Sequence, residues 1–297
     1  MTSKQTFFLL KKILIFLLFK LQKMIKNVVL DVGRVLVAWQ PLDIMRKLGF
    51  IGMGNMGQAL AGGFVASGKI DGKDIFAYAP NKEKLVANCD VIGITACSSL
   101  EEVVSKSDIV VMACKPYQIE DVFAKLGDGL CEKSILSVAA SWDYERLKKA
   151  LPANTKVQCI MPNTPVAVSE GVLLVAEEND WNKEDRLWML ELLGGVGRVV
   201  QLPTRLMDAG MAISGCGPAF VDMIIEAIAD GGVKNGLQRK QAYELVCQTL
   251  IGSAKLQMET GKHPGQLKDE VCSPGGWTIK GVAALEKSGI RSAFIEA

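Results

Sequence analysis

The segment GFIGMGNMGQALAGGF, residues 49–64, constrains the fold of this chain more than any other. An apolar run ends in the pattern G-x-G-x-x-G at Gly52, Gly54 and Gly57, and a stretch rich in Ala and Leu follows. In such a pattern the first glycine allows a tight turn, the second lets a pyrophosphate approach, and the third lets the helix pack closely. A helix start also attracts anions. The segment therefore predicts a strand, a dinucleotide-binding loop and a helix.

Beyond this segment, short β-rich runs alternate with helical stretches, which is typical of βαβ units and a mostly parallel sheet. The expected strands are 48–52, 74–78, 108–116, 134–140, 156–163, 171–178 and 197–202, and the helices include 57–67, 142–150 and 181–193. After Pro203 strands largely cease, and helices are expected at 207–214, 219–233, 239–259 and 278–287. We therefore predict an α/β Rossmann-type dinucleotide-binding domain, residues 47–203, followed by an all-α domain, residues 204–297.

The residues after the second expected strand indicate which nicotinamide cofactor the loop takes. NAD-preferring sites usually carry Asp or Glu about 20 residues beyond the glycines, where it binds the ribose 2′-hydroxyl. This chain instead has Ala-Tyr-Ala-Pro-Asn-Lys at residues 77–82. Without that carboxylate a 2′-phosphate is favoured, and Asn81 and Lys82 are its candidate partners. We expect NADPH as the preferred cofactor and NAD as the alternative.

A second unusual segment, DEVCSPGGWTIKGVAALEKSGIR, spans residues 269–291. Ser273 is a natural N-cap and Pro274 suits the first helical position, so a helix is expected to begin there. Gly275 and Gly276 would then lie in the first turn, where each costs about 1 kcal/mol relative to Ala. A small carboxylate held by the free N–H groups and the Ser273 hydroxyl would explain them. An ordinary capped helix is the alternative.

Charge and cysteine usage exclude several other classes of function. The formal net charge is +2 and there is no basic stripe, so we expect no nucleic-acid partner. Eight cysteines lie far apart without a C-x-x-C pair, and His263 is the only histidine, so we expect no metal site. His263 precedes Pro264 in a connecting loop and is expected to order that loop. Because free thiols are common in reducing compartments, we expect a cytoplasmic protein that binds a small-molecule substrate.

The first residues of the chain form an apolar run, FFLLKKILIFLLF at residues 7–19. Lys11 and Lys12 interrupt it, and no cleavage site of a signal peptide follows. A spanning helix needs about 20 apolar residues, so we expect no stable membrane insertion. The run forms an amphipathic surface helix, or translation starts at Met24, which is the interpretation that we prefer.

Seven segments, taken in order, make the rest of the chain recognisable. They are GFIGMGNMG (49–57), ACKP (113–116), MPNTP (161–165), SGCGPAF (214–220), ADGGVKNGL (229–237), HPGQLKDEV (263–271) and SPGGWTIKGVAALEKSGIR (273–291). From about residue 48 to 297 the chain resembles pyrroline-5-carboxylate reductase. The resemblance implies an NAD(P)H-dependent oxidoreductase that reduces 1-pyrroline-5-carboxylate to L-proline, the last step of proline biosynthesis. It also implies that residues 204–297 form a dimerisation domain, in a homodimer that often gathers into decamers.

The resemblance also implies which residues form the site. The expected cofactor-binding residues are Ile51, Gly52, Met53, Gly54, Asn55, Met56, Gly57, Ala113, Cys114, Lys115, Pro116, Val138, Ala139 and Ala140. The expected substrate-binding residues are Ser273, Gly275, Gly276 and Thr278. Thr278 is the expected catalytic residue, because the family places a threonine near the imine nitrogen of the substrate.

The chain departs from the family pattern at three points. Trp277 stands where relatives often have Thr or Ala, and its ring either narrows the site or points outward. Cys272 replaces a usual Ser or Thr. The chain stops at Ala297, whereas relatives commonly continue their last helix, which puts the stability of the dimer in question.

Residues 24–46 resemble the start of a haloacid-dehalogenase-type phosphatase, in which the counterpart of Asp31 is the nucleophile. Gly33 stands where such enzymes commonly carry a second Asp as general acid. The downstream residues of such an enzyme cannot follow, because the reductase segment begins at once. We expect residues 1–46 to be an N-terminal extension and a non-functional remnant. A strand added to the edge of the sheet is the alternative, and it predicts the same inactivity.

Two other classes of function stay open. A Rossmann-plus-helical dehydrogenase of the hydroxyisobutyrate type would share the glycine loop, but it should carry a catalytic Lys on a C-terminal helix and lack the S-P-G-G segment. An inactive fusion or binding module is favoured only by the unusual N-terminus and the early end of the chain.

Overall fold

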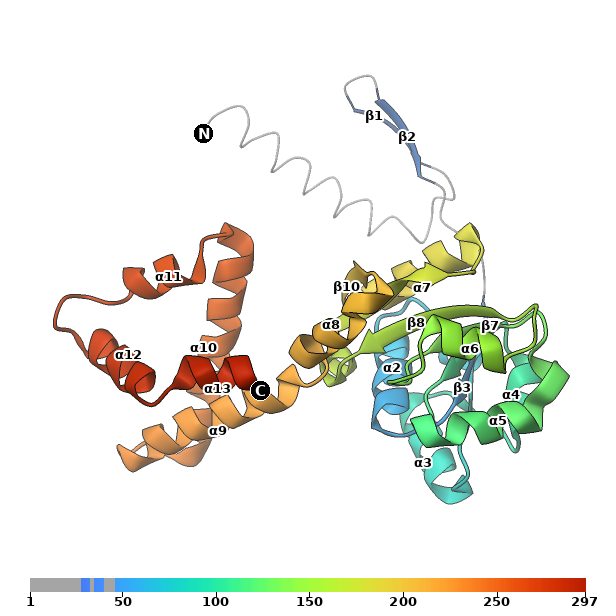
Figure 1. Ribbon diagram of the computed structural model, residues 1–297, viewed down its shortest axis with the longest axis horizontal. Coiled ribbons are helices and arrows are strands. Elements are labelled where there is room, and N and C mark those ends of the chain that lie inside the picture. Colours follow the sequence, from blue (N-terminus) through green and yellow to red (C-terminus); the bar gives the residue numbers. More distant parts are fainter. Residues whose placement is uncertain (1–27, 33–34, 40–45) are drawn as a thin grey trace. The chain divides into compact units, whose positions relative to one another are not determined.

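The computed structural model describes residues 28–32, 35–39 and 46–297, and divides into two compact units, one ending at Cys216 and the other spanning Gly217–Ala297 (Figure 1). Ahead of the first unit's main sheet, β1 (Val28–Val32) and β2 (Val35–Trp39) pair antiparallel with each other. Neither strand joins the main sheet, so the alternative interpretation, a strand added to the edge of that sheet, is wrong. The predictions for the apolar run at residues 7–19 and for Gly33 lie outside the described residues.

The main sheet of the first unit has eight strands in the order β10-β9-β8-β7-β6-β3-β4-β5. They are β3 (Leu48–Ile51), β4 (Ile75–Tyr78), β5 (Thr95–Ala96), β6 (Ile109–Met112), β7 (Ser134–Ser137), β8 (Lys156–Pro162), β9 (Gly171–Asn179) and β10 (Gly197–Leu202). Only the β8–β9 pair is antiparallel. The prediction of a Rossmann-type, mostly parallel sheet is therefore confirmed, and β5 is a short strand that the sequence did not reveal.

Helices cover both faces of this sheet, because its strands are apolar on both sides. Phe50 of β3 belongs to the core beneath α2 (Asn55–Ala66), α3 (Lys82–Ile92) and α7 (Lys183–Gly194). Its ring lies 6.4 Å from that of Phe64 on α2. The next residue, Ile51, belongs to the opposite core beneath α4 (Leu100–Lys106), α5 (Ile119–Leu126) and α6 (Tyr144–Ala150). Successive residues of β3 therefore belong to the cores on opposite faces of a doubly wound sheet.

Two polar contacts lie near the two ends of the α/β domain. Arg46 forms an ion pair with the buried Asp185 of α7, with Nη2 and Oδ1 2.7 Å apart. Arg46 therefore packs with the α/β domain, although we assigned it to the N-terminal extension. At the other end, the side chain of Asn163 donates to the carbonyl oxygen of Ser214 at 2.9 Å and accepts from the backbone N–H of Val172 at 2.8 Å. This contact holds α8 (Met207–Ser214) against the sheet, beyond the predicted boundary at residue 203.

The second unit consists of helices alone. They are α9 (Gly217–Lys234), α10 (Arg239–Thr260), α11 (Pro264–Glu270), α12 (Trp277–Lys287) and α13 (Ile290–Glu296). All of residues 217–297 are described, and only Ala229, Ala242 and Val246 among them are buried hydrophobic residues. Many larger apolar side chains are exposed. A unit of this size with so small a core needs further contacts for its stability.

One helical stretch in the described part of the chain, 204–234, is long and apolar enough by length and composition to cross a membrane. Its most apolar window has a mean hydropathy of 1.5, and none of that window is buried within the chain.

Candidate functional site

The three glycines of the G-x-G-x-x-G loop have different surroundings. A Cβ atom on Gly52, which has φ +103°, would lie 2.5 Å from the backbone nitrogen of Cys114. A Cβ atom on Gly57 would lie 2.5 Å from the carbonyl oxygen of Gly52. A Cβ atom on Gly54 would meet no protein atom within 4 Å. The outer glycines therefore close the turn, and the middle one leaves open space where a ligand can reach the backbone.

Helix α2 begins at this open position. Gly54 is its N-cap and has no side chain to bond the first N–H groups of the helix. These N–H groups have no partner within the helix, and together with the helix dipole they favour an anion. The first turn of α2 contains no acidic residue that would compete. The loop thus fits a pyrophosphate by its shape and by its charge distribution.

The sheet brings the other predicted cofactor segments to the same edge. β3 lies between β4 and β6, and β7 lies beyond β6, all of them parallel. The carboxyl ends of these strands therefore face one way, and a ligand of such a sheet binds there. The backbone N–H of Ala113 donates to the carbonyl oxygen of Ile51 at 2.9 Å, and the backbone N–H of Val138 donates to the carbonyl oxygen of Met112 at 3.2 Å. The three predicted segments, at residues 51–57, 113–116 and 138–140, follow β3, β6 and β7.

Several of the predicted cofactor residues face the protein interior. Ile51, Met53 and Ala139 are less than 10% exposed and belong to the two cores of the sheet. Met56, Ala113 and Val138 pack partly against them. These six residues can contact a cofactor only through their backbone or through the part of the side chain that is not buried. Gly54, Asn55 and Lys115 are exposed.

Cys114 and Lys115 follow β6 directly. Burial raises the pKa of the Cys114 thiol to about 11, so it stays protonated at neutral pH and is no nucleophile. Lys115 is the N-cap of the short helix η2 (Pro116–Gln118), and its backbone N–H donates to Oε1 of Gln118 at 3.1 Å. Lys115 itself is exposed.

The site for the 2′-phosphate differs in part from the prediction. Asn81 is the N-cap of α3, and its side-chain oxygen accepts from the backbone N–H of Lys84 at 2.9 Å. That oxygen is therefore committed to the helix, and only the amide nitrogen is left for a ligand. Lys82 and Lys84 are both exposed on the first turn of α3. Lys84 was not among the predicted site residues, although its position three residues after an Asn-capped helix start is a usable signal.

The glycines of the second segment, Gly275 and Gly276, have a structural explanation that differs from the predicted one. The backbone N–H of Gly276 donates to the carbonyl oxygen of Ser273 at 3.0 Å, and Gly275 has φ +70°. These are the features of a type II turn, with Pro274 at its second position. Glycine at position 276 avoids a Cβ atom that would lie 2.5 Å from Oγ of Ser273.

Helix α12 consequently starts later than predicted. Its N-cap is Gly276, not Ser273, and its first residue is Trp277. Thr278 is the second residue of the first turn and is exposed, as is Ser273. Gly276 leaves the N–H groups of Trp277 and Thr278 without a side-chain cap. The ring of Trp277 is 95% exposed, so within this unit it points outward rather than narrowing the turn.

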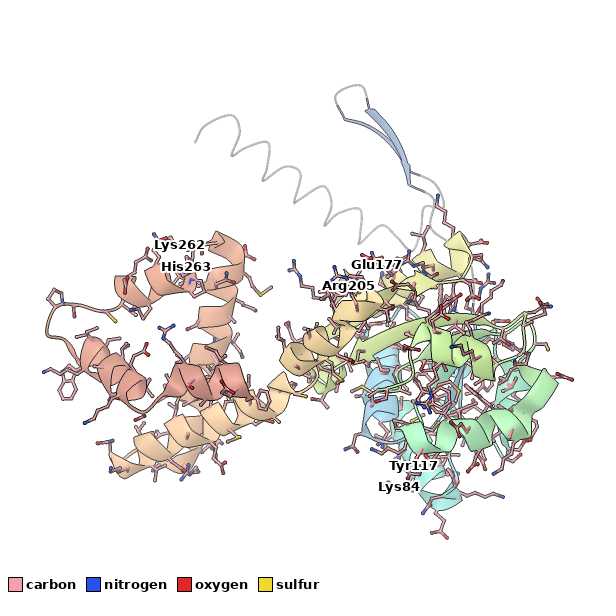
Figure 2. The ribbon with its side chains drawn as sticks, viewed as in Figure 1. Lys84, Tyr117, Glu177, Arg205, Lys262 and His263 are labelled. Carbon is pink, nitrogen blue, oxygen red and sulfur yellow. The ribbon has the colours of Figure 1, made fainter. Side chains whose placement is uncertain are left out.

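His263 is the N-cap of α11, where its Nδ1 atom accepts from the backbone N–H of Gly265 at 3.1 Å. The predicted loop-ordering role is confirmed. Figure 2 labels His263 beside Lys262, whose ammonium group pairs with Glu270 at 2.7 Å. In the described residues no group of three or more His, Cys, Asp or Glu side chains could hold a metal ion.

Two family models match the chain. Residues 204–297 match "Pyrroline-5-carboxylate reductase dimerisation", and residues 47–141 match "NADP oxidoreductase coenzyme F420-dependent". The chain is 40% identical over 253 residues to the pyrroline-5-carboxylate reductase of Escherichia coli K12. The aligned region covers 85% of this chain and 94% of that relative. Its Methanosarcina acetivorans counterpart is 41% identical over 256 residues, with 85% and 94% covered. The chain belongs to the pyrroline-5-carboxylate reductase family.

A solved structure of the family agrees. The crystal structure of Plasmodium falciparum pyrroline carboxylate reductase with NADP bound is 33% identical, with a TM-score of 0.78 over 84% of this chain and 93% of that one. The predictions of the fold class, of an NAD(P)H-dependent reductase of this family and of an NADP cofactor are confirmed. Membership of the family also excludes the hydroxyisobutyrate-type alternative. The sequence matches of both family models begin at residue 47 or later, and neither includes the phosphatase-like residues 24–46.

Proposed function

We propose that this chain reduces 1-pyrroline-5-carboxylate to L-proline with NADPH, using the glycine loop for the cofactor and the turn at residues 273–276 for the substrate. The observation that carries the proposal is that one chain combines two open backbone sites, at Gly54 and at the uncapped start of α12. This chain is 40% identical to a pyrroline-5-carboxylate reductase over 94% of that relative's length.

The substrate carboxylate binds at the start of α12. The N–H of Gly276 is committed to the turn, so the carboxylate takes the free N–H groups of Trp277 and Thr278, at the positive end of the helix dipole. The Ser273 hydroxyl supplies a further donor. Gly275 and Gly276 contribute by forming the turn without side chains over the site. The helix has 11 residues, long enough for its dipole to assist.

The reaction then needs positioning more than acid-base chemistry. NADPH supplies a hydride when it is bound. A protonated cyclic imine is already electrophilic, so the chain has to align the imine carbon and hold the ring nitrogen as its charge is lost. The Thr278 hydroxyl accepts a hydrogen bond from that nitrogen, while the neighbouring N–H groups hold the carboxylate. The protonated thiol of Cys114 takes no part.

The preference for NADPH over NADH follows from the residues that come directly after β4. Residues 77–82 contain no carboxylate, and Lys82 is exposed on the first turn of α3. A 2′-hydroxyl therefore finds no acceptor of the usual kind, whereas a 2′-phosphate meets positive charge and a helix start.

The second unit forms a homodimer, and dimers gather into decamers. The exposed apolar side chains of α9 and α10 include Met223, Ile228 and Leu245, each more than half exposed. A hollow of about 310 Å³ between these helices is lined by Ile228, Leu237, Leu245 and Val246, among others. A second copy that covers this surface supplies the core that the unit lacks, and explains the apolar composition of residues 204–234 without a membrane.

The enzyme works in the cytoplasm, and residues 1–45 take no part in the reaction. All eight cysteines are free, which suits a reducing compartment. Among the described strands, β1 and β2 pair only with each other, and the family matches begin at residue 47. Deletion of residues 1–45, which keeps the Arg46–Asp185 ion pair, should therefore leave reductase activity intact. Loss of activity in a folded deletion variant would contradict this part of the proposal.

Steady-state kinetics test the function. Purified enzyme should oxidise NADPH, followed by its absorbance, when pyrroline-5-carboxylate is added, and kcat/KM should be higher with NADPH than with NADH. Hydroxyisobutyrate with NADP⁺ is the control substrate and should give no turnover. Absence of turnover by the folded dimer would refute the proposed function, and a clear NADH preference would refute the cofactor assignment.

A further inference from the structure

Trp277 has a large apolar ring that its own unit leaves uncovered. It is 95% exposed, more than any other large hydrophobic residue in the described part of the chain. None of the aromatic or cation–π contacts among the described residues includes its ring. Because tryptophan is usually well buried in a folded protein, packing within residues 217–297 does not explain why an indole stands at this position.

The side chain of Trp277 borders the turn at residues 273–276. Trp277 is the first residue of α12, and the Cα–Cβ bonds of an α-helix tilt toward its N-terminus. The turn has no side chain at its two glycines, and a Cβ atom on Gly275 would meet no protein atom within 4 Å. The start of α12 therefore combines open space, free backbone N–H groups and an aromatic ring beside them.

The acidic side chains that precede this turn are already paired with lysines. Asp269 pairs with Lys268, with Oδ1 and Nζ 2.9 Å apart, and Glu270 pairs with Lys262 at 2.7 Å. The first turn of α12 contains no acidic residue. A ligand that carries a positive charge beside its carboxylate therefore finds no unpaired carboxylate in residues 262–279.

The proposed substrate is a ligand of this kind. Its carboxylate needs N–H groups, and its protonated ring nitrogen needs a group of negative potential. The Thr278 hydroxyl accepts one hydrogen bond from that nitrogen. The face of an aromatic ring also carries negative potential, and tryptophan attracts cations most strongly among the aromatic side chains. The indole of Trp277 is thus a second group at the helix start that can offset the positive charge.

We propose that the indole of Trp277 packs against the ring of the bound substrate and selects ligands whose five-membered ring carries a positive charge. These ligands are the protonated imine and the cyclic ammonium of the product, L-proline. Trp277 departs from the family pattern, so this selection belongs to this chain. The inference rests on the proposed function in one respect, that the carboxylate binds at the start of α12. Trp277 contacts the ligand and transfers no proton.

Two ligands of the same shape separate charge from size. L-Proline has an ammonium group in its ring, and (S)-tetrahydrofuran-2-carboxylate has a neutral ether oxygen in its place. We would titrate the full-length protein with each ligand by calorimetry at neutral pH, alone and with NADP⁺ bound. Trp277→Leu should weaken L-proline relative to the ether about threefold to thirtyfold, the range of a cation–π contact. Because a lost apolar contact affects both ligands alike, the ratio of the two Kd values reports the charge. Trp277→Phe keeps a weaker π face and should give an intermediate ratio.

Phe294→Leu is the control, because it removes another half-exposed ring of the same unit and should leave the ratio unchanged. Trp277→Leu should keep the melting temperature of the wild type, since the ring is exposed. The inference is overturned if Trp277→Leu weakens both ligands equally or neither, if it lowers the melting temperature markedly, or if the wild type binds neither ligand. Charge-selective binding in a protein that fails to reduce pyrroline-5-carboxylate would refute the proposed function and leave this inference standing. Reduction by an enzyme whose ratio is unchanged in Trp277→Leu would do the reverse.

Discussion

Gly57 lies so close to Gly52 that a Cβ atom on Gly57 would come within 2.5 Å of the Gly52 carbonyl oxygen. The first and last glycines of the loop are therefore in backbone contact, and the start of α2 is pressed against the end of β3. No real Cβ atom tolerates such a distance to a backbone atom. The requirement for glycine at position 57 is thus one of packing within the protein.

Gly57→Ala should destabilise the α/β domain, because the added methyl group displaces either the loop or the helix. We expect a loss of about 1–3 kcal/mol in the free energy of unfolding, the usual cost of overpacking, measured by chemical denaturation. Gly62→Ala in the same helix is the matched control. A Cβ atom there meets nothing within 4 Å, so this variant should gain about 0.5–1 kcal/mol from helix propensity. Equal effects of the two substitutions would contradict the packing argument.

Gly54→Ala should behave in the opposite way to Gly57→Ala. Its Cβ atom meets no protein atom, and Gly54 has φ −78°, which alanine adopts readily. Because alanine is a poorer N-cap than glycine, the variant should lose a little stability, but less than Gly57→Ala does, while its methyl group occupies the space that the pyrophosphate needs. We expect the Kd for NADPH, from fluorescence titration, to rise at least tenfold. Normal NADPH binding by this variant would mean that the pyrophosphate does not approach Gly54.

The glycine loop could be located from the sequence because its information is local. Gly52, Gly54 and Gly57 sit between a strand and a helix that the neighbouring residues specify. The start of α12 was predicted wrongly because Ser273 and Pro274 suit two structures equally well. Ser-Pro opens a capped helix, and Pro is also favoured at the second position of a type II turn. The left-handed φ of Gly275 decides between them, and a sequence does not display it.

Other residues escaped prediction because their roles depend on distant parts of the chain. Asn163 joins two backbone groups 9 and 51 residues away, so its role is visible only in the folded domain. The same holds for Arg46, whose partner Asp185 lies 139 residues away.

Thr278→Ala should lower kcat/KM for pyrroline-5-carboxylate roughly tenfold to a hundredfold. The reason is the loss of one hydrogen bond to the ring nitrogen in the transition state, which costs about 1 to 3 kcal/mol. Because Thr278 lies in the second unit, away from the glycine loop in the chain, the Kd for NADPH should barely change. Thr278→Ser keeps the hydroxyl and should retain most of the activity. Full activity of the alanine variant would remove Thr278 from the site.

Stability should fall at alkaline pH, because burial raises the pKa of Cys114 to about 11 and that of Cys159 to about 12, from an ordinary value of 9.0. Between pH 9 and these values the unfolded chain has lost both thiol protons and the folded chain keeps them. Each thiol then lowers the free energy of unfolding by at most about 1.4 kcal/mol per pH unit. Cys159→Ala should flatten this decline in denaturation measured from pH 8 to 11, whereas Cys131→Ala, at an exposed position, should not. An unchanged slope in Cys159→Ala would contradict the assignment.

Transfer of deuterium from labelled cofactor to product tests the central claim most directly. NADPH deuterated at C4 of the nicotinamide ring, in each of its two stereochemical forms, would be incubated with the enzyme and pyrroline-5-carboxylate, and the product would be analysed by mass spectrometry and NMR. We predict L-proline that carries one deuterium at C5, from one of the two labelled forms only. Proline without deuterium, deuterium at another carbon, or no proline at all would contradict direct hydride transfer to the imine carbon in this enzyme.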